Sequence, residues 1–290
     1  MPIPTRRAAG AAALLLLALA ACAAPPPAAA PGPPLSYPPD VRDRLLRIAR
    51  EEWTEWGRLV SVPDIAGAAH QSLEDAAIPG PESALPNFPR VLAYWRAVEN
   101  AEATGAIARN RARYAVTLAH PGAASLPGGG VWREPAWSAA FISYLMLRAG
   151  VDRREFPSSA AHSFYVDGML ATAAAFPAEA PFIPRDWFSY APQPGDLVCA
   201  DRSGRPLADW RARAAEAGQF RPMHCDLVVS LSPGIVEAVG GNVADAVTLS
   251  RFPADAAGQL LARPPGGPIW FAVFENRLGR LPPWNRSPAS

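Results

Sequence analysis

The chain has 290 residues, of which half are hydrophobic, and its 27 Lys and Arg nearly balance 26 Asp and Glu. A chain of this length can bury a sizeable core, and its near-neutral charge gives no indication of a nucleic-acid partner. Only four His and three Cys are present, without a Cys-x-x-Cys pair, which argues against a zinc site. No metal or organic cofactor is implied.

The N-terminal residues have the character of an export signal. Arg6 and Arg7 precede an apolar run over residues 8–20, which is too short to cross a membrane as a mature helix. The run ends in Leu19-Ala20-Ala21-Cys22, which resembles the lipobox of bacterial lipoproteins. An ordinary secretory signal with a chance cysteine is the alternative.

The lipobox resemblance implies removal of residues 1–21 and a lipid on the Cys22 thiol, with the membrane as a partner through that anchor. Ala23 follows the cysteine, which by the lipoprotein sorting pattern implies the periplasmic face of the outer membrane. Residues 22–39 are almost entirely Ala and Pro, a composition typical of an extended tether.

Helical periodicity dominates the next part of the chain, residues 40–119. Val41, Leu45 and Ile48 recur at three- and four-residue steps and predict a helix over 40–59. A second pattern predicts a helix over 89–118, broken near Gly105, and the segment between the two is expected to be a loop.

A glycine-rich loop over residues 120–130 lacks the pattern of a phosphate-binding loop, so nucleotide binding is not expected. Pro135 and Gly150 then bracket an almost wholly apolar segment, which predicts a buried helix over 136–148 with Ser138 at its start. Another helix is expected over 163–176, directly after His162.

From Pro194 onward the pattern changes to short β-branched runs bounded by turn residues. Helices followed by strands predict an α+β fold with a mostly antiparallel sheet of about five strands. We expect one domain over residues 120–275 and a surface tail over 276–290. The predicted strands are 196–200, 225–231, 235–239, 247–252 and 269–274.

Cys199 and Cys225 fall on two of these strands. In an oxidising compartment such a pair forms a disulfide, and the alternative is two buried free thiols. The sequence leaves both open.

Four segments together carry a resemblance to a known superfamily. They are the helix start Trp137-Ser138-Ala139-Ala140-Phe141, the segment Pro194-Gly195-Asp196-Leu197-Val198, the strand that opens with His224, and Gly241-Asn242. Their order resembles that of papain-like cell-wall hydrolases of the NlpC-type and CHAP branches. Within that superfamily, the chain resembles a bacterial lipoprotein family of uncharacterised function. The resemblance covers about half of the chain.

The resemblance implies a site with Ser138 at the position of the usual cysteine, His224 as the base and Asn242 as the residue that orients the imidazole. Two departures weaken it: the nucleophile position holds a serine, and Gly240 stands where the CHAP pattern often has a glutamate. A serine hydroxyl is far less acidic than a thiol, so it needs a well-placed base. Ser138 is therefore either the nucleophile or a helix cap.

Three further residues are candidates for the binding site. Trp137 is expected either in the wall of a cleft or in the core, and His162 either lines the cleft or caps a helix. Asp226 lies two residues from His224, which places both on one face of the strand. Its carboxylate is expected either to orient the imidazole or to bind an amine.

Three functions remain. The first is a lipid-anchored envelope hydrolase that cleaves amide bonds in peptidoglycan. The second is a catalytically silent papain-like domain that binds a cell-wall peptide or a protein partner. The third is a transferase that passes an acyl group through Ser138.

Overall fold

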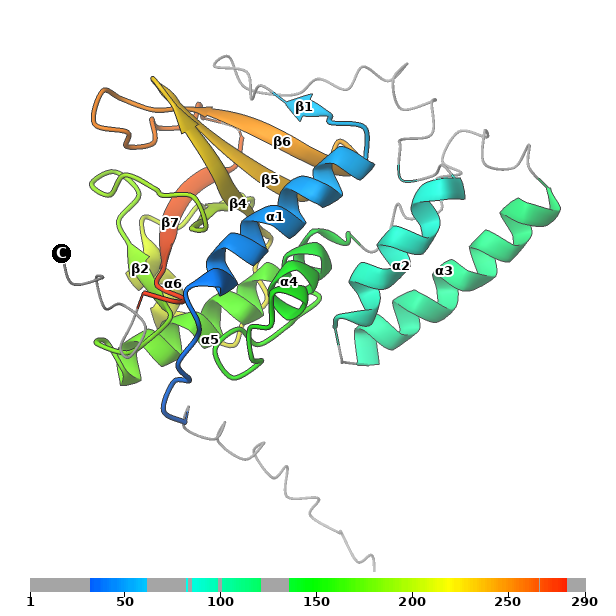
Figure 1. Cartoon of the computed structure of the whole chain (residues 1–290), viewed down its shortest axis with the longest axis horizontal. Helices are drawn as coiled ribbons and strands as arrows, with labels where there is room; N and C mark the ends of the chain where they lie inside the picture. The colour runs from blue at the N-terminus through cyan, green and yellow to red at the C-terminus, as the bar shows by residue number, and fades with distance from the viewer. Residues whose placement is uncertain are drawn as a thin grey trace, which may run out of the picture. The chain divides into compact units, whose positions relative to one another are not determined.

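The computed structural model describes residues 32–61, 82, 85–98, 101–120, 136–265 and 267–280. Within these residues the chain is α+β, with helices packed on a mixed sheet (Figure 1). Cys22, with the expected signal peptide, lies outside the described residues, as does most of the glycine-rich loop. No helix among the described segments has the length and apolar character needed to cross a membrane.

The sheet has seven strands in the order β1-β6-β5-β4-β3-β7-β2. Five of them fall at the predicted positions and pair antiparallel, as expected, but the prediction of about five strands was too low. The two additional strands are short and lie at the edges, where β1 pairs parallel with β6. The strands are β1 Val60–Ser61, β2 Phe182–Arg185, β3 Leu197–Asp201, β4 Met223–Ser232, β5 Ile235–Val243, β6 Ala246–Pro253 and β7 Ile269–Asn276.

The predicted helices are present, and a six-residue helix over 210–215 was not predicted. In the second helical pattern, one helix ends at Arg96 and the next begins at Ala101, whereas Gly105, the expected break, lies inside the latter helix. The C-terminal stop at Gly150 is confirmed, because this residue has a φ of 86°. The helices are α1 Asp40–Glu55, the short 3₁₀ helix η3 Leu85–Asn87, α2 Phe88–Arg96, α3 Ala101–Ala119, α4 Ser138–Ala149, α5 His162–Ala175 and α6 Trp210–Ala215.

One hydrophobic core joins α4 to the sheet and to the helices that precede it. Phe141 and Leu145 of α4 are fully buried against Leu45 of α1 and Trp95 of α2. The expected helical region over residues 40–119 therefore shares its core with the domain that follows it. Alternate residues of the strands, such as Val198 of β3, form a second cluster on the other face of the sheet.

Both expected flexible ends of the domain differ from the prediction. Tyr37, inside the expected tether, is buried, and its hydroxyl donates to Glu155 Oε2 at 2.6 Å. Leu278, inside the expected tail, is 1% exposed and belongs to the main core, and Asn276 ends β7. Single aromatic and apolar residues in polar or Pro-rich segments thus attach both ends to the fold.

Cys199 of β3 and Cys225 of β4 form a disulfide. The two residues are direct partners in the antiparallel ladder, with 4.1 Å between their Cα atoms. Of the two alternatives that the sequence left open, the structure has the bridged one, which cross-links the two central strands next to His224.

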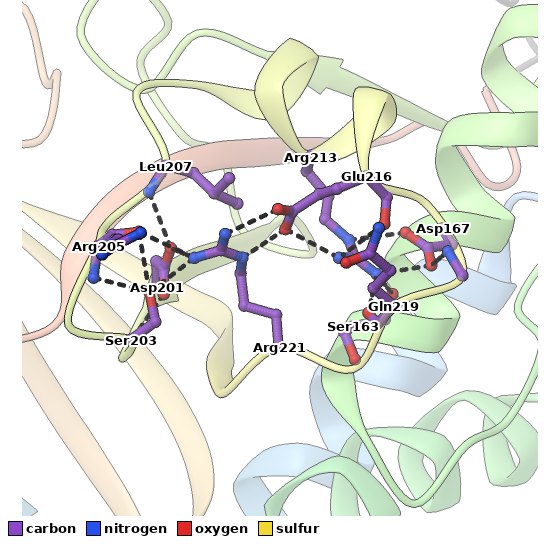
Figure 2. A network of polar contacts seen from close by, with 11 residues as sticks. Ser163, Asp167, Asp201, Ser203, Arg205, Leu207, Arg213, Glu216, Gln219 and Arg221 are labelled. Atoms are coloured by element: carbon purple, nitrogen blue, oxygen red, sulfur yellow. Dashed lines mark hydrogen bonds and ion pairs between the residues drawn. The ribbon is translucent and has the colours of Figure 1, made fainter.

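A polar network fixes α5 to the connection between β3 and β4 (Figure 2). The Arg213 side chain of α6 is fully buried and donates to both carboxylate oxygens of Asp167 on α5, at 2.7 and 2.6 Å. It also donates to the carbonyls of Ser163 and Gln219. Because Ser163 follows the first residue of α5, this network holds the start of that helix in place.

Replacing Arg213 is expected to destabilise the fold strongly, because Asp167 and two carbonyls would lose a buried partner. We predict that Arg213→Met lowers the free energy of unfolding by about 3–5 kcal/mol in urea denaturation. The matched control is Arg211→Gln on the same helix, whose side chain is 55% exposed and pairs with Asp186. This control is expected to cost less than about 1 kcal/mol, and equal losses in the two variants would contradict the role of Arg213.

Candidate active site

Ser138 is the first residue of α4 and is 7% exposed. The buried residues after it hold the start of this helix against the sheet. The Ser138 hydroxyl lies 2.7 Å from Nε2 of His162, the first residue of α5. Two helix starts that are 24 residues apart in sequence therefore supply a hydroxyl and an imidazole in hydrogen-bond contact.

A set of short polar contacts places His162 beside Ser138. The Ser143 hydroxyl, on α4, donates to the carbonyl of Ser159 and accepts from its N–H. The Ser159 hydroxyl in turn accepts from the N–H of Ala161, which directly precedes α5. The segment that leads into α5 is thus tied to the helix that carries Ser138.

The second ring nitrogen of His162 contacts the hydroxyl of Tyr165, one turn further along α5. A neutral imidazole has one donor and one acceptor nitrogen, so two arrangements satisfy both contacts. In the first, Nδ1–H donates to Tyr165 and Nε2 accepts from Ser138. In the second, the Tyr165 hydroxyl donates to Nδ1, and Nε2–H donates to Ser138. Only the first leaves Nε2 free to take the serine proton.

A second imidazole lies next to the first. The ring centroids of His162 and His224 are 5.2 Å apart, and His224 Nε2 lies 2.9 Å from Asp226 Oδ1. Asp226, expected on the same strand face as His224, contacts its imidazole, and a role in orienting that ring stays a prediction. The carboxylate also explains Gly240, because a Cβ atom there would come within 1.7 Å of Asp226 Oδ1. Asp226 on β4 thus occupies the space that a side chain at Gly240 would need.

Burial keeps the imidazole of His162 uncharged. His162 is 4% exposed, and its burial, followed by the nearby His224 and Arg202, holds its pKa well below the ordinary value of 6.5. Burial and the charge of Asp226 raise the pKa of Tyr165 well above 10. Both groups are therefore neutral at pH 7, as proton transfer from Ser138 to His162 requires.

Two of the three expected catalytic residues do not make the contacts predicted for them. His224 was expected as the partner of Ser138, but His162 takes that place, and His224 is paired with Asp226 on its own strand. Asn242 was expected to orient the imidazole. Tyr165 contacts His162 instead, and no hydrogen bond joins Asn242 to either histidine among the residues that the structure describes.

Trp137 lies in the core and does not line a surface. It is fully buried and stacks on Trp56, with ring centroids 5.4 Å apart. Its Nε1–H donates to Glu82 Oε2 at 2.7 Å. Trp137 was expected either in a cleft wall or in the core. The structure places it in the core, where its ring packs against Trp56, which directly follows α1, and against Tyr94 of α2.

Sequence reasoning missed Tyr165 and Glu82, and it missed the direct contact of His162 with Ser138. The His162-x-x-Tyr165 spacing was a usable signal, since residues three apart on a helix lie on one face. Glu82 gave no signal, because it follows a Pro-Gly stretch without periodicity. In the described part of the chain, no group of three or more His, Cys, Asp or Glu residues is arranged to hold a metal ion.

Comparison with known families gives one match, over residues 83–276. This span contains all the residues of the Ser138–His162 site. The chain belongs to the family described as "Uncharacterized protein conserved in bacteria (DUF2272)". Neither the curated proteins nor the solved structures that we compared gave a match.

Glu82 makes the stability of this region depend on pH. Burial raises its pKa from 4.5 to about 7, against the hydrogen bond from Trp137. The folded state therefore favours the protonated carboxyl, and the stability from this group is present below pH 4.5 and lost as the pH rises through 7. We predict that Glu82→Gln stabilises the protein at pH 8 relative to the unsubstituted chain, by up to about 3 kcal/mol, and has little effect at pH 4.

Urea unfolding at the two pH values measures this difference. Glu51→Gln on α1 is the control, because its side chain is 57% exposed. If Glu82→Gln follows the same pH dependence as the unsubstituted protein, Glu82 does not titrate in this range.

Proposed function

We propose that this protein is an amide hydrolase of the bacterial cell envelope in which Ser138 is the nucleophile and His162 is the base. The observation that carries the proposal is the 2.7 Å contact between the Ser138 hydroxyl and His162 Nε2. A hydroxyl in contact with a neutral imidazole that has a third residue on its other nitrogen is the general arrangement of an activated serine.

The reaction follows from the positions of these groups. The Ser138 oxygen forms a bond to the carbonyl carbon of the substrate amide while its proton passes to His162 Nε2. The N–H groups of Ala139 and Ala140 lie in the first turn of α4, where backbone donors have no acceptor within the helix, and they are suited to stabilise the oxyanion. The amide C–N bond then breaks as His162 gives the proton to the leaving amine. Water, with His162 again as base, hydrolyses the acyl-serine ester and restores the Ser138 hydroxyl.

The positive charge of the protonated His162, which forms during the reaction, has no carboxylate in contact with it within the described segments. Tyr165, a neutral phenol, contacts Nδ1 where a serine hydrolase triad has a carboxylate. Asp226 raises the pKa of Tyr165 by its charge and is itself paired with His224. The supporting acid therefore acts through a second layer of residues, which favours a slow enzyme.

The substrate class and location come from the sequence resemblances. The likeness to papain-like cell-wall hydrolases indicates the peptide amides of peptidoglycan. The lipobox-like segment ending at Cys22 indicates a lipid anchor in the cell envelope, with the domain held in reach of the cell wall.

A second function is favoured by the burial of the site. Ser138 is 7% exposed and His162 is 4% exposed, so little of either group is open to solvent. A papain-like domain that has lost catalysis and binds a cell-wall peptide or protein partner would keep such a buried pair for stability.

Substitutions of Ser138, His162 and His224 distinguish the hydrolase from the binding protein. We predict that Ser138→Ala and His162→Ala each lower amine release from purified peptidoglycan at least about 100-fold, whereas His224→Asn lowers it less. Because the pKa of His162 lies well below 6.5, the rate is expected to stay level as the pH falls from 8 to 6.5.

The assay is colorimetric detection of new amino groups at each pH, with thermal unfolding to verify that each variant is folded. Peptidoglycan that binds without amine release would support the binding protein. If His224→Asn abolishes release and His162→Ala does not, the assignment of the base is wrong.

A further inference from the structure

Arg263 lies in the connection between β6 and β7 and is held by two aromatic rings. Its guanidinium carbon is 4.8 Å from the ring centroid of Trp270 and 5.4 Å from that of Phe252. The two rings pack edge to face, with 4.8 Å between centroids, so the surface under the guanidinium is fixed. Arg263 is therefore pre-organised by stacking, which attracts a cation to the ring face.

This guanidinium has no acidic hydrogen-bond partner. Among the residues that the structure describes, the Arg263 side chain forms no hydrogen bond or ion pair, although it is only partly exposed. Asp226 attracts it through space, and Oδ1 of that carboxylate is paired with His224. Its planar set of N–H donors thus remains available to a ligand.

The register of the sheet places Trp270, on which Arg263 stacks, on the same face of the sheet as His224. Ala200 on β3 is the ladder partner of His224 on one side and of Trp270 on the other. The three residues form one row across neighbouring strands and share a face. Because two strand spacings separate them, the backbones of His224 and Trp270 are about 10 Å apart. Ala200 contributes only a methyl group to this row, and Gly240 adds no side chain beside Asp226.

The charges that act on Arg263 do not neutralise it. Arg202 is positive and Asp226 is negative, so Arg263 itself leaves an excess of one positive charge in this group of three. An anionic group of a ligand is therefore attracted to the Arg263 end of the row.

We propose that Arg263, stacked on Trp270, binds a free carboxylate of the peptide substrate and so selects peptides that end in a carboxylate near the cleaved amide. The planar guanidinium fork matches the two oxygens of a carboxylate. The proposal rests on the proposed function for the fate of the bound peptide, but the binding itself does not need Ser138.

The test compares two ligands on a protein that cannot cleave them. The full-length Ser138→Ala variant is titrated by calorimetry with N-acetyl-Ala-Ala as the free acid and as the C-terminal carboxamide. We expect the acid to bind about tenfold more tightly than the amide, as for a hydrogen-bonded charged pair. Adding Arg263→Gln should abolish this preference, and Arg263→Lys should keep only part of it.

The control is Arg251→Gln on β6, which removes an equal charge from the same sheet, where Arg251 pairs with Glu237. It should leave the preference unchanged. Equal binding of acid and amide, absence of binding by both at millimolar concentration, or a preference that survives Arg263→Gln in a folded protein would overturn the proposal. A preserved preference without any hydrolysis by the unsubstituted protein would count against the proposed function alone.

Discussion

The contact between the Ser138 hydroxyl and the His162 imidazole is the interaction on which the chemistry of this protein depends. It exists because two helices begin at the same place: α4, buried against the sheet, and α5, tied to α4 through Ser143 and Ser159. The Arg213 network then fixes the start of α5 from the side of the β3–β4 connection (Figure 2). Core packing and the Arg213 network thus both hold the Ser138 hydroxyl and His162 Nε2 at 2.7 Å from each other.

The same burial that forms this contact limits what it can do. An imidazole shielded from water stays neutral, which makes it a suitable acceptor for the serine proton. The imidazolium formed during attack then lies in a site without a carboxylate on its Nδ1. Asp226 is near enough to raise the pKa of Tyr165, and its position opposite Gly240 shows that the acid comes from β4 and not from the strand of Gly240.

The sequence was informative where a single pattern decides a structure. The buried helix ending at Gly150, the five central strands and the pairing of Asp226 with His224 followed from apolar periodicity and strand alternation. The edge strand β2 was missed because it contains Pro184, which is tolerated at a sheet edge but is not typical of strands. The six-residue helix α6 was missed because it is too short for a periodic signal, although Asp209 caps it.

The site was predicted less well than the fold because its partners depend on tertiary packing. His162 and His224 were both candidates, and sequence spacing cannot decide which of two imidazoles from different elements reaches Ser138. The resemblance to papain-like hydrolases favoured His224, the strand residue. In the structure, the connection between α4 and α5 places His162, and not His224, in contact with the Ser138 hydroxyl.

Catalysis by Ser138 requires that His162 Nε2 accepts the hydrogen bond from the Ser138 hydroxyl. Nitrogen-15 NMR of the imidazole at pH 7 reports which ring nitrogen carries the proton, and the His162→Asn variant assigns the signals. The account predicts a neutral ring with the proton on Nδ1, donated to Tyr165, and a bare Nε2 that becomes free of its hydrogen bond in Ser138→Ala. A proton on Nε2 at pH 7, or a fully protonated ring, would contradict the account, because the imidazole could not then act as the base for Ser138.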